Sequence, residues 1–222
     1  MSLSPAAVPA SFIKNLEFDP VQEMLSLIGA GLPGVGLDSP PLGCYILLEL
    51  SDNEFFRFPL SCSSSDIGRA LFIFSARQEA AGAVSRFIAD QPEDLDRGAD
   101  RALLAMGEAI VANFADFVRF TVETPFNGFS MIPGGEPLRD QFIFNAVSVS
   151  RLIYLGAKFG GLSPRETLWE YPLAALGHLI ACGADAEGQK GVGRPKDPED
   201  IKLQIKLARE RAERGEKQPW QS

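Results

Sequence analysis

The feature that most constrains the fold is the helical spacing of apolar residues through the middle of the chain. Three segments, 67–89, 96–124 and 136–159, repeat apolar side chains three and four residues apart, as one face of a helix requires. A charged break and a break rich in proline and glycine separate them. The third segment is apolar around most of its circumference, which is typical of a helix in the centre of a bundle. The sequence therefore predicts a helical bundle over residues 66–184.

A β-hairpin is expected before this bundle. Residues 44–50 and 55–60 are rich in strand formers, and the polar segment 51–54 between them has turn chemistry. Pro59 suggests that the second strand lies at an edge, and an isolated hairpin is marginal in water. With an arm and a short helix before it, the hairpin completes an N-terminal unit over residues 1–65. The predicted class is α+β, mainly α.

The helical pattern is interrupted at Gly160–Leu179. Two glycines stop the preceding helix, and a Ser-Pro-Arg-Glu sequence follows, with serine placed as N-cap and glutamate as its capping-box partner. A proline six residues after this glutamate disfavours helical geometry at the residue before it, so the helix should split there. We predict a structural pivot that tryptophan anchors on the bundle. Its residues are Ser163, Pro164, Glu166, Trp169 and Pro172.

The composition changes near residue 185. Residues 185–222 hold nine Lys and Arg and eight Asp and Glu, a net charge of +1. The whole chain has 21 basic and 29 acidic residues, so the preceding part keeps 12 and 21, a net charge of −9. Residues 199–214 combine high charge with good helix formers, and their apolar stripe is too thin for a core. We expect residues 185–222 to form a polar helical tail that is flexible or bound to a partner.

Several kinds of chemistry are disfavoured by the composition. A net charge of −8 disfavours nucleic acid as a partner, because phosphate contacts need clustered Lys and Arg. Three cysteines and one histidine do not make a zinc-ligand set. Residues 29–34 spell G-x-G-x-x-G, but helical rather than strand spacing precedes them, so we interpret them as a loop. We expect no catalytic residue, no metal and no cofactor. Without a signal peptide or a spanning apolar run, we expect a soluble, cytoplasmic protein outside the membrane.

Two alternatives remain open. His178 is the only histidine that could act as a general base, although apolar residues flank it. Residues 157–169 also have the pattern of a helix-turn-helix, which would make the chain a DNA-binding or regulatory protein. Only Arg165 stands where a reading helix would contact bases, and Pro172 shortens that helix.

Apolar residues outside the bundle pattern are the candidate partner contacts. The loop at 126–135 carries apolar side chains that are costly unless covered, and the hairpin edge could bind a partner by strand addition. The tail supplies a third group. The candidate partner-binding residues are Phe56, Phe58, Phe126, Phe129, Met131, Ile132, Ile201, Ile205 and Trp220.

One stretch points to a family. Gly-Leu-Ser-Pro-Arg-Glu-Thr-Leu-Trp-Glu-Tyr-Pro-Leu, at residues 161–173, resembles a motif of tail assembly chaperones and related small tail-region proteins of tailed bacteriophages. The resemblance covers 13 of the 222 residues. It implies a non-enzymatic protein that assembles a phage or prophage-like tail, or forms part of the virion. Its partners would then be proteins, in a homo-oligomer or a larger assembly, in the host cytoplasm or the particle.

Overall fold

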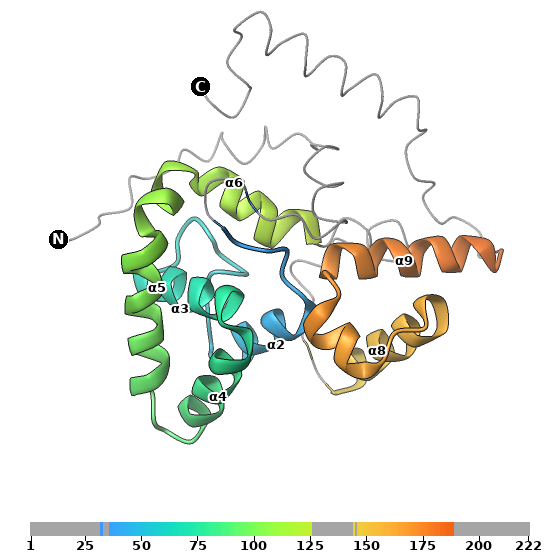
Figure 1. Ribbon diagram of the computed structural model, residues 1–222, viewed down its shortest axis with the longest axis horizontal. Coiled ribbons are helices and arrows are strands. Elements are labelled where there is room, and N and C mark those ends of the chain that lie inside the picture. Colours follow the sequence, from blue (N-terminus) through green and yellow to red (C-terminus); the bar gives the residue numbers. More distant parts are fainter. Residues whose placement is uncertain (1–31, 33–35, 126–143, 145, 189–222) are drawn as a thin grey trace, which may run out of the picture.

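The computed structural model describes residues 32, 36–125, 144 and 146–188 (Figure 1). These residues form helices, and no strand occurs among them, which confirms a mainly helical fold. The helices of the described residues are α2 (Leu42–Leu50), α3 (Ser64–Ser75), α4 (Arg77–Ile88), α5 (Glu93–Ala112), α6 (Phe114–Val118), α8 (Ala146–Gly160) and α9 (Leu173–Ala186), together with the π-helices η2 (Arg119–Glu123) and η4 (Glu166–Glu170).

The prediction of a hairpin is wrong. Residues 44–50 belong to helix α2, and residues 55–60 form turns. A short apolar run has no clear period, so its pattern does not separate a strand from a buried helix. Packing decides here, because α2 contacts α3, α4 and η4 and buries most of its circumference. The polar connection does turn the chain: Asn53 accepts a hydrogen bond from the amide of Phe55 and donates one to the carbonyl of Asp66.

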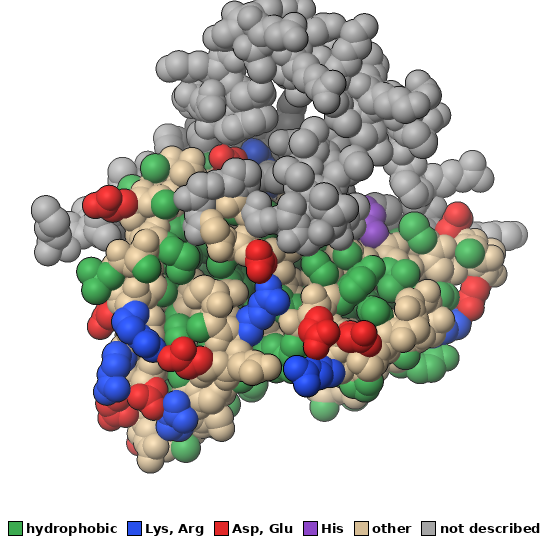
Figure 2. Space-filling view, viewed as in Figure 1, with side chains coloured by type: hydrophobic (Ala, Val, Ile, Leu, Met, Phe, Trp, Pro, Cys, Tyr) green, Lys and Arg blue, Asp and Glu red, His purple; other side chains and the backbone are tan. Residues whose placement is uncertain are grey.

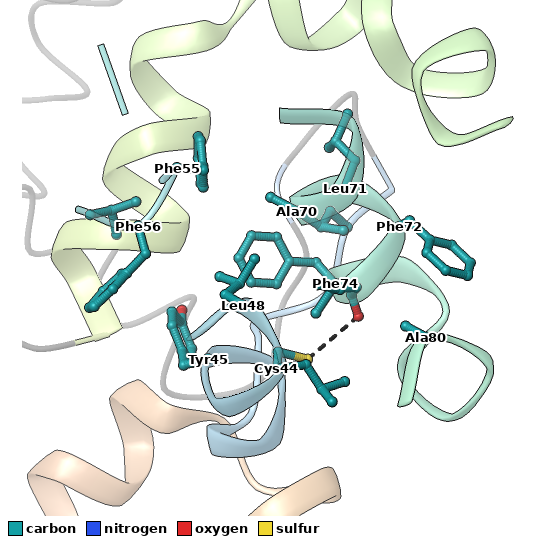
Figure 3. Packing of buried hydrophobic residues seen from close by; sticks show 14 of the residues in the cluster. Cys44, Tyr45, Leu48, Phe55, Phe56, Ala70, Leu71, Phe72, Phe74 and Ala80 are labelled. Carbon is teal, nitrogen blue, oxygen red and sulfur yellow. Dashed lines mark hydrogen bonds between the residues drawn. The ribbon is translucent and has the colours of Figure 1, made fainter. Parts of the chain in front are cut away.

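Aromatic rings fill the centre of the core. Tyr45 of α2 lies 5.8 Å from both Phe56 and Phe74, and Phe55 lies 5.1 Å from Phe117, measured between ring centroids. Figure 3 shows the rings of Tyr45, Phe55, Phe56 and Phe74 together. The buried hydroxyl of Tyr45 donates a 2.7 Å hydrogen bond to the carbonyl of Thr121 in η2. Residues on both sides of position 65 therefore share one core.

The helices form two groups, one at each end of the long axis of the molecule. Helices α3, α4 and α5 pack together at one end, whereas α8 packs on α9 and η4 at the other (Figure 1). The two long helices expected over 67–89 and 96–124 are each interrupted, the first at Ala76 and the second at Asn113. Helix α2 lies between the two ends, where it contacts both α4 and η4.

Candidate contact surfaces

The predicted capping box is present at the Gly160–Leu179 corner. The amide of Ser163 donates to the Glu166 carboxylate at 2.8 Å, and the amide of Glu166 donates to the Ser163 hydroxyl at 3.2 Å. These bonds satisfy amides that a helix start leaves without intrahelical partners. Hydrogen bonding lowers the pKa of the Glu166 carboxyl; the hydroxyl of Ser163 makes the largest contribution and the backbone amide of Ser163 the second. The corner is therefore fixed locally before it meets the rest of the protein.

Both ends of the capped segment are where the sequence predicts them. Helix α8 ends at Gly160, and Gly161 takes the left-handed conformation, with φ of 65°, that glycine accepts without strain. Tyr171 is extended, with ψ of 125°, and α9 begins directly after Pro172. Pro172 therefore divides η4 from α9, because the residue before a proline avoids helical geometry.

Close contacts hold the corner against α2. A Cβ atom added to Gly43 would lie 2.5 Å from Cζ3 of the Trp169 ring, so the ring lies directly on the α2 backbone. The carbonyl of Trp169 accepts a hydrogen bond from Arg77 of α4 at 3.3 Å. The amide of Leu173 donates to the carbonyl of Pro40 at 3.0 Å, next to an isolated bridge between Pro41 and Pro172. Trp169 is half-buried and packs on the core, as an anchor requires.

Glycines bring α8 close to the corner and to α9. A Cβ atom at Gly156 would lie 2.9 Å from the Thr167 hydroxyl, and one at Gly160 would lie 2.5 Å from the Leu179 side chain. Gly183 of α9 lies directly beside the ring of Phe159. At the amino end of α8, the carboxylate of Glu49 accepts a 2.6 Å hydrogen bond from the amide of Phe144.

The sequence predicts that helix α8 lies in the centre of a bundle, but the structure places it at the periphery. Leu152 and Gly156 are its buried residues, whereas Val147, Arg151 and Tyr154 are exposed. Helices α9 and η4 pack on α8, where Gly156 lies against Thr167 and Leu176. The helix therefore presents a partly apolar face to solvent.

A similar face is exposed on the second half of α5. Leu104 and Val111 are exposed, and so are Ala105, Glu108 and Ala112 on the same side. Neither face is predicted by the sequence, because apolar residues at helical spacing indicate a core face. One signal was available: α8 contains Arg151 and Lys158 and no acidic residue, in a protein of net charge −8.

The predicted partner-binding residues have different positions. Phe58 is exposed on a turn. Phe56 is buried with its ring against Tyr45, and residues 55–60 form turns where the sequence predicts a strand edge. The remaining candidates lie outside the described residues: Phe126, Phe129, Met131, Ile132, Ile201, Ile205 and Trp220.

Charged side chains are mixed over the face that Figure 2 shows. Basic and acidic groups lie next to one another there. Ion pairs of the described residues include Arg86 with Asp94 and Arg101 with Glu79, both at 2.6 Å. Arg165, the candidate for base reading, lies 3.1 Å from a carboxylate oxygen of Glu170. A nucleic-acid site needs clustered positive charge instead.

The cysteines and the histidine are dispersed. Cys44 is buried, with its thiol directed at the carbonyl of Ile73, and burial raises its pKa to about 12 (Figure 3). Burial also raises the pKa of Cys62, to about 11. His178 lies half-buried on α9. Within the described residues, no group of three or more His, Cys, Asp and Glu side chains could hold a metal ion.

Comparison with known proteins finds no matching family model, and neither a curated protein nor a solved structure matches the chain. Of the helices in the described ranges, none is both long and apolar enough to cross a membrane.

Proposed function

We propose that this protein is a non-enzymatic component of phage or prophage-like tail assembly, in the host cytoplasm or the virion, and that it acts through protein–protein contacts. The exposed face of α8 carries the proposal. On the exposed side of this helix, Val147 and Tyr154 lie beside Arg151, whereas the described elements that pack on α8 contact the opposite side. Exposed apolar surface of this kind is typical of sites where proteins meet.

The position of the motif supports the same function. Residues 161–173, which resemble the tail assembly chaperones, form the corner that follows α8 directly. Gly156 of α8 lies against Thr167 of this corner, and Gly160 lies against Leu179 just beyond it. The residues that carry the resemblance therefore also set the orientation of the exposed helix.

Deletion of the gene from the phage or prophage that encodes it tests the proposal. We expect electron microscopy to show heads without complete tails, and wild-type protein supplied in trans to restore them. Tyr154→Asp should fail to restore tails, because it places a charge on the exposed face of α8, whereas Ile88→Asp should restore them. Ile88 is a matched control, since it is exposed and apolar but belongs to α4. Normal tails on the particles of the deletion strain would contradict the proposal.

A further inference from the structure

Two helices at opposite ends of the molecule expose faces of the same pattern (Figure 1). On α5, Leu104 and Val111 are 88% and 64% exposed, and on α8, Val147 and Tyr154 are 78% and 63% exposed. In each helix the two apolar residues are seven positions apart, about two turns, so they lie on one side. We define the α5 face as Leu104, Glu108 and Val111, and the α8 face as Val147, Arg151 and Tyr154.

The charges at the centres of these faces are opposite. Glu108 follows Leu104 by four positions, Arg151 follows Val147 by four positions, and both charged side chains are exposed. When the two faces meet, in either relative direction, the central carboxylate lies beside the central guanidinium and apolar residues flank the pair. Two copies of the same face would instead bring like charges together, which is unfavourable. Charge therefore favours contact between an α5 face and an α8 face over contact between two copies of the same face.

The partners of the other arginines make Arg151 distinctive. Among the described residues, the arginines with a carboxylate oxygen within 4 Å are Arg57, Arg69, Arg86, Arg97, Arg101, Arg119 and Arg165. Arg77 donates to the carbonyl of Trp169 instead. Arg151 has neither kind of partner among the described residues, and α8 carries no carboxylate beside it. Within the described part of the chain, its guanidinium therefore lies at the surface without a carboxylate beside it.

We propose that the partner of the α8 face is a second copy of this chain, bound through its α5 face. The inference rests on the proposed function and names a partner for it. Because helices α5 and α8 lie at opposite ends of the long axis, each copy can use one helix for each neighbour. Such a head-to-tail contact generates a ring where the rotation closes and a filament where it does not.

The contact should be weak for a single pair of copies. Each face spans about two helical turns, which places its area at the small end of specific interfaces. Association should therefore increase with concentration, and closure of a ring would strengthen it. A charge placed on either face should weaken it about 10- to 100-fold, because burial of one large apolar side chain contributes that much to binding.

A mixing experiment with blocked faces tests the inference on the full chain. Leu104→Asp blocks the α5 face, Tyr154→Asp blocks the α8 face, and Ile88→Asp is the control outside both. Light scattering with size-exclusion chromatography should show masses that rise with concentration for the wild type and the control. Each blocked variant alone should stay at 24.1 kDa. An equimolar mixture of the two blocked variants should give twice that mass and nothing larger, because only one intact pair of faces remains. Circular dichroism checks that each variant is folded.

Charge reversal provides an independent test. Glu108→Arg and Arg151→Glu should each weaken association by about fivefold, as loss of an exposed ion pair does. The two changes in one chain should restore it, since the pair then forms with reversed signs.

Three results would overturn the inference: a wild type that is monomeric at every concentration, a Leu104→Asp variant that still dimerises, or a mixture without dimer. If the wild-type protein is monomeric but deletion of its gene abolishes tails, self-association is excluded and the proposed function stands. If the protein associates but the deletion strain has normal tails, self-association stands and the proposed function is excluded.

Discussion

Replacement of Gly43 by alanine should destabilise the protein, because Trp169 lies where the new methyl group must go. The added Cβ would lie 2.5 Å from Cζ3 of the ring and 2.7 Å from the carbonyl oxygen of Leu168. The second contact is with backbone, so rotation of a side chain cannot relieve both. Overpacking of this kind costs about 1–3 kcal/mol. For a domain of this size, that corresponds to a fall in Tm of roughly 2–12 °C.

Gly107→Ala is the matched control. Gly107 also lies within a helix, α5, but nothing is within 4 Å of a Cβ atom added there. Alanine favours the helix by about 0.5–1 kcal/mol over glycine, so this variant should be as stable as the wild type or more so.

Urea and thermal unfolding measure both variants. In a Trp220→Phe background, fluorescence reports Trp169 alone, and its emission should shift if the ring leaves α2. A Gly43→Ala protein that is as stable as Gly107→Ala, with unchanged Trp169 emission, would refute the packing of the corner on α2.

The remaining predictions concern the capping box. Ser163→Ala should lower the free energy of unfolding by about 1 kcal/mol, the usual cost of losing an N-cap, whereas Ser85→Ala on the exposed side of α4 should not; urea unfolding of both compares them. Nuclear magnetic resonance titration should find the pKa of Glu166 below its ordinary value in the wild type and closer to that value in Ser163→Ala. Because folding lowers this pKa, the carboxylate stabilises the protein above about pH 4.3, the ordinary glutamate value. That stabilisation should disappear as the pH falls through the pKa of Glu166 in the folded protein. A difference in the free energy of unfolding between wild type and Glu166→Gln that persists below this pKa would contradict the stabilising role of the carboxylate.

The parts of the fold that depend on neighbouring residues could be predicted from the sequence. The capping box needs only Ser163 and Glu166 three positions apart, and the end of α8 needs only Gly161 in a conformation that glycine accepts. The split before α9 follows from Pro172 alone. In each case the deciding interaction lies within a few residues along the chain.

The conformation of residues 44–50 could not be predicted in the same way. Their apolar side chains suit a strand as well as a helix, and the choice depends on distant contacts. Tyr45 bonds to Thr121, and the neighbouring Gly43 accepts the ring of Trp169, which is more than 100 residues away in sequence. No local pattern contains that information.

The exposed faces were hidden for a different reason. An apolar residue that a partner covers looks the same in sequence as one that the core covers. Tyr154 and Leu152 both carry large hydrophobic side chains on one helix, yet Tyr154 is exposed and Leu152 is buried. What separates the two sides of α8 is charge, because Arg151 and Lys158 both lie on the exposed side.

The most direct test of the account is whether another protein molecule covers Tyr154. A Ser150→Cys variant in a Cys182→Ser background places a reactive thiol beside Tyr154 and leaves the α8 face intact, because Ser150 is exposed and lies four positions before Tyr154 on the same helix. Cys182 is replaced because it is otherwise the exposed cysteine of the described residues. Maleimide labelling read by mass spectrometry should be fast in dilute protein and should slow as protein concentration rises. Addition of Leu104→Asp protein, whose α5 face is blocked, should give no further protection. A labelling rate that does not depend on concentration, or a thiol that is protected even in dilute protein, would contradict the account.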